Sequence, residues 1–234
     1  EHEAEPNSSR SYVLTSKIFI DQFAERDLSP STYTLRSGDL NSDGQLDLIL
    51  ATEESVTHEW DEATQSLRLL HIPNPNYILM NQGDGSFGVP MIWGESRGFS
   101  DLRLADIDND NDLDIVALST LMDAPDESPV PKNNEVLIYV NDGKGAFGAG
   151  RKLPVPLEQL AAFHSDVPTD DLSRPLYLSI VVGDVDGDAD FDIIADIGTQ
   201  IVLPGGEENG IVTDYISTSS APFLYLNDGN GQFS

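Results

Sequence analysis

The sequence predicts an all-β fold of three repeated four-stranded units, the arrangement found in the blades of a β-propeller. An Asp-rich block occurs three times without gaps, with its first Asp at positions 39, 106 and 184. A second block, in which an Asn and a Phe stand six residues apart, follows each copy. The copies begin 67 and then 78 residues apart, which is enough chain for one blade.

Each unit is expected to contain four short strands. Apolar residues alternate around the first Asp-rich block, with Tyr33 and Leu35 before it and Leu46, Leu48 and Leu50 after it. The second block follows another apolar run and contains Asn-Asp-Gly or Gln-Gly-Asp-Gly, which supplies the positive φ angles of a tight hairpin. The fourth strand then begins at the Phe.

The repeats are assigned approximately to residues 30–95, 96–155 and 174–234, within a propeller segment that spans residues 11–234. Residues 1–10 are expected to form a polar tail, such as remains after a leader is cleaved. Three blades with the spacing of a seven-bladed ring do not close, so we expect part of a larger propeller or an open, oligomerising one, whose open strand edges invite self-association. The strand-like run at residues 11–22 is expected to fill a fourth-strand position, in a fuller propeller or in a neighbouring molecule.

The chain is strongly acidic, with 12 Lys and Arg against 41 Asp and Glu and a formal net charge of -29. A field of that sign repels phosphate backbones, which argues against nucleic acid as a partner. No stretch approaches the ~20 consecutive apolar residues of a membrane span. The absence of cysteine excludes disulfides and thiolate metal sites.

The Asp-rich blocks have the chemistry of calcium-binding loops. Side chains that carry oxygen occupy positions 1, 3, 5 and 9 of each block, and position 7 would contribute its backbone carbonyl. Alternate side chains on a tightly wound loop converge on one point, where Ca²⁺ takes about 6 to 8 oxygens. The sequence therefore predicts three Ca²⁺ sites. The predicted ligands are Asp39, Asn41, Asp43, Gln45 and Asp47; Asp106, Asp108, Asp110, Asp112 and Asp114; and Asp184, Asp186, Asp188, Asp190 and Asp192.

An EF-hand is the alternative interpretation of such a loop, but it needs a Glu at position 12 and a helix on each side. Position 12 is Leu50, Ala117 or Ala195 in the three copies, and both flanks have the pattern of strands. Position 6, where Gly is usual, is Ala189 in the third copy. Alanine in the left-handed region costs roughly 1 kcal/mol, which predicts a weaker or differently shaped third site.

The two kinds of block resemble FG-GAP/VCBS repeats, the units of the integrin α-subunit propeller and of many secreted bacterial proteins. The blocks are GDLNSDGQLDLIL, ADIDNDNDLDIVA and GDVDGDADFDIIA, with YILMNQGDGSF, LIYVNDGKGAF and LYLNDGNGQF downstream. The resemblance covers about residues 30–234 and implies a calcium-stabilised propeller that is secreted or at the cell surface. It does not imply one activity, because such propellers serve adhesion, sugar binding and occasionally catalysis.

Ligand binding is expected at the loop face opposite the calcium loops. In a four-stranded meander the calcium loops and the Asn-Gly hairpins share one edge, and the long insertions, where binding residues concentrate, share the other. The candidate contacts to a sugar or a basic peptide are Trp60, Trp93, His164 and Tyr215. The leading hypothesis is a non-enzymatic module for adhesion or ligand recognition, which binds a protein or carbohydrate at the cell surface.

The alternative hypothesis is a secreted carbohydrate-active enzyme or a lectin, whose acid and base would be loop carboxylates within residues 53–62 or 123–127. Enzymatic motifs are weak. Residues 94–98 (GESRG) fit GxSxG but lack the strand-to-helix context that exposes a nucleophile. Neither an HExxH motif nor a Cys pair indicates zinc.

Overall fold

The structure is a computed structural model that describes residues 32–52, 55–62, 65–72, 74–95, 98–119, 135–154, 175–203, 207–208, 211–212 and 215–234. Within these ranges every regular element is a β-strand, which confirms the predicted all-β class. They include no helix that could cross a membrane. The predicted tail at residues 1–10 and the strand-like run at residues 11–22 lie outside them.

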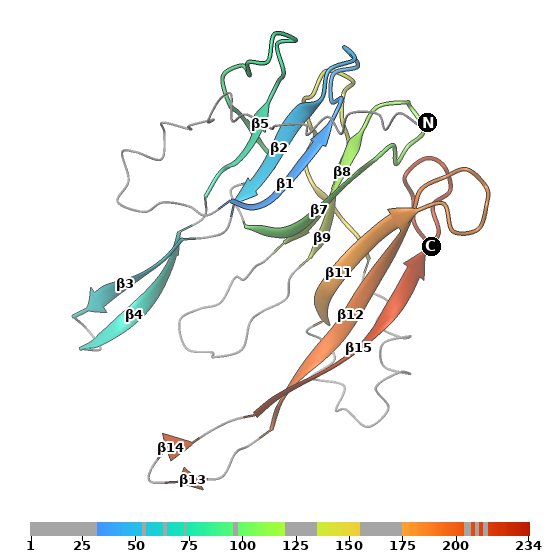
Figure 1. The fold of residues 1–234 in the computed structure, drawn as a ribbon. Coiled ribbons are helices and arrows are strands. Elements are labelled where there is room, and N and C mark those ends of the chain that lie inside the picture. The colour runs from blue at the N-terminus through green and yellow to red at the C-terminus, as the bar shows by residue number, and fades with distance from the viewer. Residues whose placement is uncertain are drawn as a thin grey trace, which may run out of the picture.

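The first repeat forms a four-stranded antiparallel sheet with the strand order β1-β2-β5-β6 (Figure 1). Its strands are β1 (Thr32–Gly38), β2 (Asp47–Thr52), β5 (Asn76–Leu79) and β6 (Met91–Trp93). Between β2 and β5 the chain forms a separate hairpin of β3 (Ser55–Asp61) and β4 (Ser66–Ile72). The predicted insertion in this repeat is therefore a paired hairpin.

The second repeat has the same plan, and the third has it in part. The second sheet has the order β10-β9-β8-β7, and the third has the order β11-β12-β15. These strands are β7 (Phe99–Ala105), β8 (Asp114–Ser119), β9 (Val136–Tyr139), β10 (Arg151–Lys152), β11 (Pro175–Gly183), β12 (Asp192–Leu203) and β15 (Tyr215–Tyr225), with β13 (Glu207–Glu208) and β14 (Ile211–Val212) as a small hairpin. The predicted four-stranded unit is thus present in the first two repeats, and the described part of the third contributes three strands.

Bridges between paired residues close the second block of each repeat as predicted. Each bridge joins the Asn to the Phe six residues later, and the pairs are Asn81–Phe87, Asn141–Phe147 and Asn227–Phe233. The intervening Gly residues have positive φ, for example Gly143 at 74° and Gly145 at 79°. Each block is therefore a tight hairpin whose turn needs residues that tolerate the left-handed region.

The core lies between successive sheets. Strand β8 is buried along its whole length because alternate side chains face opposite neighbours. Ile115 and Ala117 pack in the cluster shared with the first sheet. Val116 and Leu118 pack in the cluster shared with the third sheet. A strand that is buried on both faces carries a continuous apolar run, as residues 115–118 (IVAL) of β8 do.

The connections divide between two ends of the molecule. In Figure 1 the loops that follow β1, β5 and β11 lie toward the upper end of their sheets. The hairpins β3–β4 and β13–β14 project from the lower end. This arrangement separates the Asp-rich loops from the insertions, as the meander predicts.

Candidate metal centres

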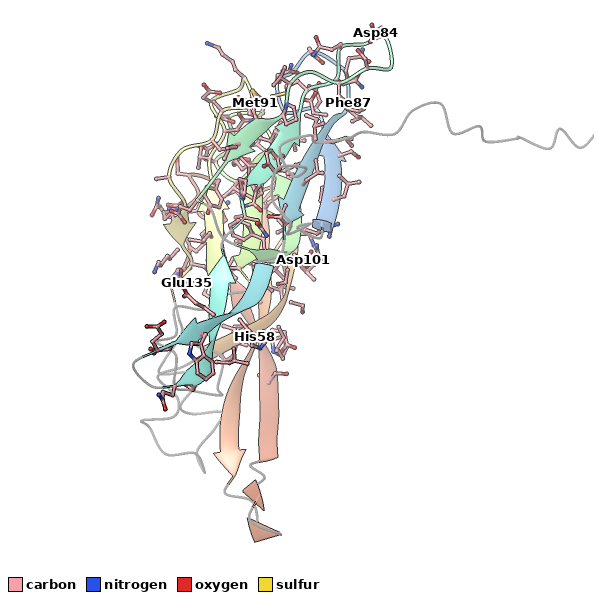
Figure 2. The ribbon with its side chains drawn as sticks, turned by 90° about the vertical axis from the view of Figure 1, so that its left-hand side faces the viewer. His58, Asp84, Phe87, Met91, Asp101 and Glu135 are labelled. Atoms are coloured by element: carbon pink, nitrogen blue, oxygen red, sulfur yellow. The ribbon has the colours of Figure 1, made fainter. Side chains whose placement is uncertain are left out.

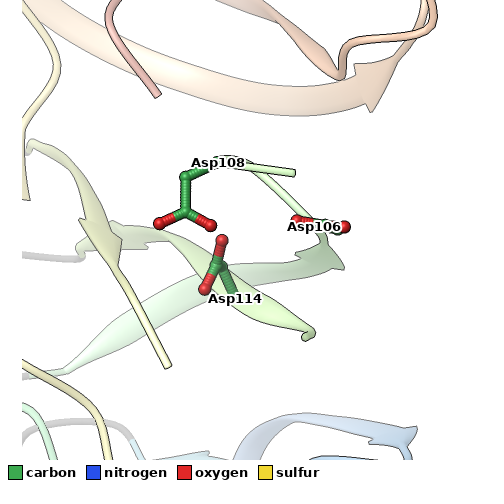
Figure 3. A group of neighbouring side chains, drawn as sticks. All are labelled: Asp106, Asp108 and Asp114. Atoms are coloured by element: carbon green, nitrogen blue, oxygen red, sulfur yellow. The ribbon is translucent and has the colours of Figure 1, made fainter. Parts of the chain in front are cut away.

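The loop between β7 and β8 brings three carboxylates together (Figure 3). Oxygens of Asp106, Asp108 and Asp114 all lie within 4.8 Å of one another. Two oxygens bound to one Ca²⁺ at about 2.4 Å are at most about 4.8 Å apart. The spacing of these three side chains therefore fits one calcium ion.

The electrostatics of this cluster also fit a cation. Oδ1 of Asp108 is buried and has no hydrogen-bond partner. Burial, followed by the charges of Asp110 and Asp106, raises the pKa of Asp108. Burial raises the pKa of Asp114 to about 6, against the opposing effect of backbone N–H donors from Asn141 and Ile107. This unpaired oxygen could coordinate a positive ion, whose charge would offset the repulsion among these groups.

Hydrogen bonds from backbone N–H groups to carboxylates of the same loop hold this loop in a tight turn. Asp106 accepts the backbone N–H of Asp110 at Oδ1 (3.1 Å) and that of Asn111 at Oδ2 (2.9 Å). Asp110 Oδ1 in turn accepts the N–H of Asp112 at 3.0 Å. The left-handed residues are Asn109 (φ 60°) and Asn111 (φ 73°). Asn is among the non-Gly residues that best tolerate this conformation, so the sequence encodes the winding directly.

Residues 39–117, which hold the first two Asp-rich loops, match the family model of the FG-GAP-like repeat. Residues 39–117 are therefore similar to FG-GAP-like repeats. The match confirms the family predicted from the two kinds of block. A search of curated proteins gave no match to the sequence.

The third Asp-rich loop, which lies outside the matched residues, has a more exposed cluster. Oxygens of Asp184, Asp186 and Asp188 lie within 4.8 Å of one another, and all three residues are exposed. Desolvation, followed by the charge of Asp188, raises the pKa of Asp186. Ala189 at position 6 has φ 78°, so the alanine does adopt the strained left-handed conformation.

The first FG-GAP-like loop keeps the same winding with fewer carboxylates. Asp39 accepts the N–H of Asp43 (3.1 Å) and of Gly44 (2.8 Å), as the equivalent Asp does in the second loop. Position 3 is Asn41, whose Nδ2 donates to Asp43 Oδ2 at 2.9 Å. An amide here lowers the repulsion within the loop and still offers one oxygen to a cation.

Position 9 has a second role that the sequence interpretation missed. In the second loop Asp114 is fully buried, and its Oδ2 accepts the N–H of Ile107 while its Oδ1 accepts the N–H of Asn141, both at 2.8 Å. The same pair of bonds is made by Asp47 and Asp192. This Asp therefore ties the Asp-rich loop to the second block of its own repeat. The only sequence signal for this link is that the Asp and the Asn recur together in every repeat.

In the second and third loops, the side chain at position 7 contacts the preceding repeat. Asp112 Oδ1 accepts a hydrogen bond from Ser42 Oγ of the first loop at 3.2 Å. Asp190 accepts one from Asn109 Nδ2 of the second loop. The side chains at position 7 therefore contribute to contacts between loops, in addition to the backbone carbonyl predicted as a ligand.

The four predicted ligand contacts lie in different settings. Trp60 is 57% exposed on β3, beside its cross-strand partner Leu67, which is 64% exposed. Figure 2 shows His58 of the same hairpin far from the loop that carries Asp84. Tyr215 begins β15, and His164 lies outside the described residues.

Trp93 belongs to the core between the first two sheets. It is 3% exposed, stacks on Phe99 with the ring centroids 5.2 Å apart, and meets Tyr139 edge-on at 5.5 Å. Its Nε1 donates to the carbonyl of Leu50 at 3.2 Å. This burial leaves Trp93 almost no surface with which to contact a ligand.

Proposed function

We propose that the chain is a calcium-stabilised part of a β-propeller that binds a cationic protein segment in an extracellular setting. The observation that carries this proposal is the exposed Trp60 on a hairpin at the end opposite the FG-GAP-like loops. The loops would stabilise the scaffold, and the hairpin end would recognise the partner. Long insertions on a rigid scaffold are where binding residues concentrate.

Three residues of each loop would hold calcium. They are Asp39, Asn41 and Asp43 in the first loop, Asp106, Asp108 and Asp114 in the second, and Asp184, Asp186 and Asp188 in the third. When bound, the ion supplies positive charge that offsets the repulsion among these side chains. Extracellular calcium modules bind at about 10⁻⁴ to 10⁻³ M, a range that suits the exposed carboxylates of the third loop.

A cationic protein segment is the partner that the hairpin favours. The indole of Trp60 and the side chain of Leu67 form an exposed apolar pair, and Glu59 and Glu62 beside them are also exposed. An indole face attracts a Lys or Arg side chain, and nearby carboxylates strengthen that attraction. The formal net charge of -29 adds a long-range field that steers cationic partners toward the chain.

A binding screen tests this proposal. The full chain, immobilised in the presence of calcium, is exposed to basic, neutral and acidic peptides and to a glycan library. Basic peptides should bind, with an affinity that falls as salt rises. Loss of about 1 kcal/mol from one cation–π contact should weaken binding about fivefold in Trp60→Ala.

Val89→Ala is the matched control, because Val89 is an apolar side chain that is 84% exposed and lies just before β6, outside the β3–β4 hairpin. This variant should bind like the unmodified chain. Glycans that bind while basic peptides do not, or a Trp60→Ala variant with unchanged affinity, would contradict the proposed partner. Localisation is tested separately, by comparing the chain in cell fractions and culture medium.

A further inference from the structure

The junctions between neighbouring repeats are built from the same contacts. Nδ2 of Asn141 donates to Leu113 O of its own repeat (3.1 Å) and to Leu40 O of the preceding repeat (2.9 Å). Asn227 repeats this pattern by donating to Ile107 O of the preceding repeat at 2.7 Å. The Asn of the second block therefore holds two successive repeats together.

In the first two repeats, one face of the sheet packs against the following repeat. The register aligns three equivalent sets of residues on this face, here called the forward face: Leu40, Ile49 and Ile78; Ile107, Val116 and Ile138; and Val185, Ile194 and Leu224. The first two sets are at most 1% exposed. In the third set Val185 is 48% and Leu224 is 46% exposed, and the adjacent Val181 is 54% exposed. The forward face of the third repeat is thus an apolar surface of the kind that a following repeat covers elsewhere.

The first repeat presents the complementary surface, here called the backward face. Leu35 is 50% and Leu46 is 60% exposed. The residue equivalent to Leu35 in the second repeat is Leu102, which is fully buried against the first repeat. Among the residues that the structure describes, Nδ2 of Asn81 donates to Leu46 O of its own repeat, at 3.1 Å, and to no carbonyl of another repeat. Asn141 and Asn227 use the second donor position of this amide across a junction.

The polar groups of the two free faces are matched to each other. At both internal junctions a side chain at position 4 donates to an Asp at position 7 of the next repeat. The pairs are Ser42–Asp112 and Asn109–Asp190. On the free forward face position 4 is Gly187, and on the free backward face position 7 is Gln45. Gly187 has no side-chain donor and Gln45 has no carboxylate, so a junction between these faces would leave neither kind of group unpaired. An unpaired donor or carboxylate in a junction would cost free energy.

The free faces also match in shape. A Cβ atom on Gly38 would lie 2.7 Å from Leu113 Cδ1, because Leu113 packs on this glycine across the first junction. The equivalent glycine of the third repeat is Gly183, which has nothing within 4 Å of that position. Leu46, the equivalent of Leu113, is exposed on the backward face. Leu46 of a second copy would therefore fill the space beside Gly183.

We propose that the forward face of the third repeat docks on the backward face of the first repeat in a second copy of this chain. Asn81 of one copy then donates to the carbonyl of Val185 in the other, as Asn141 does to Leu40. Two such junctions related by a twofold axis close a ring of six repeats. That number lies within the range of roughly four to eight blades found in propellers.

Molar mass and mixing of variants test this arrangement. Sedimentation of the full chain should give twice the 25.5 kDa of one copy. Val185→Asp and Leu35→Asp should each give a single copy, because each buries a charge at both junctions. Mixing the two variants should restore a complex of two copies, since the pair retains one intact junction. Val89→Asp, outside both faces, should leave the mass doubled.

Cross-linking gives a second test that tolerates weak association, and it is specific because the chain has no cysteine of its own. A Gly183→Cys chain mixed with a Leu46→Cys chain should form mixed disulfide dimers on oxidation, and neither variant alone should do so. Circular dichroism checks that each variant is folded. Sedimentation as one copy together with an absence of mixed cross-links would overturn the proposal. Efficient cross-linking of Gly183→Cys with itself would also overturn it, because that product needs two forward faces to meet.

Discussion

In a single copy of the chain, replacing Asn141 by alanine should destabilise the protein far more than the same change at Asn81. Asn141 is 4% exposed. Its side chain donates to Leu40 O and Leu113 O and accepts the N–H of Gly145 at 3.0 Å. Asn81 is half-buried, and its side chain makes two bonds, to Leu46 O and from Gly83 N, both within its own repeat. The comparison therefore isolates the bond that crosses the junction.

The size of the effect follows from these contacts. Each buried hydrogen bond contributes about 0.5 to 1.5 kcal/mol net, and a buried group left without a partner costs about 1 to 3 kcal/mol. Asn141→Ala removes three hydrogen bonds and leaves the buried carbonyl of Leu40 without this donor. We therefore expect the free energy of unfolding to fall by about 3 to 5 kcal/mol. In the Val185→Asp background, which keeps the chain as a single copy, Asn81→Ala should lower the free energy of unfolding by about 1 kcal/mol, because water replaces its exposed contacts. Asn227→Ala should resemble Asn141→Ala, because Asn227 makes the equivalent bond to Ile107.

Urea denaturation in the presence of calcium measures these free energies of unfolding. The slope of unfolding free energy against urea should be the same for all variants, so that midpoints can be compared. Equal losses for Asn141→Ala and Asn81→Ala would refute the inference that this Asn holds successive repeats together. Separate transitions in Asn141→Ala would instead show that the junction couples the repeats into one folding unit.

Three further predictions concern the loops. Ala189→Gly should stabilise the protein by about 1 kcal/mol and tighten the third site, because φ 78° strains an alanine; an unchanged melting temperature and affinity would contradict this. Calcium binding should weaken as the pH falls through about 6, because burial raises the pKa of Asp114 to about 6 and the ion must then displace a proton. Titration calorimetry from pH 7 to 5 measures the effect, and a constant affinity would count against Asp114 as a ligand. Chelation should lower the melting temperature, and readdition of calcium, but not of magnesium, should restore it.

The local features of this fold could be predicted from sequence because they are set by short patterns. The winding of the Asp-rich loops follows from alternating carboxylates and from left-handed residues such as Gly44 and Asn111. The hairpins follow from Asn-Gly and Asp-Gly turns, and the strands from alternating apolar residues. Each of these signals lies within a dozen residues, so no knowledge of the tertiary contacts is needed.

The contacts between distant segments could not be predicted in the same way. The sequence predicts Trp93 as a contact to a ligand, but Trp93 is buried because Phe99 and Tyr139 of the next repeat pack on it. The sequence predicts Asp114 as a metal ligand, and Asp114 also accepts the backbone N–H of Asn141. Both outcomes depend on which sheet faces which, and the sequence pattern of one strand does not specify its neighbour across the core.

The central claim, that the three Asp-rich loops bind calcium, is tested most directly by counting bound ions. Elemental analysis of the full chain, dialysed against buffer with calcium, should give three calcium ions per chain. Asp108→Asn and Asp186→Asn should each lose one ion, and Asp142→Asn, in the exposed hairpin beside the second loop, should lose none. A chain that contains no calcium after this dialysis, and whose melting temperature is the same with and without a chelator, would contradict the account.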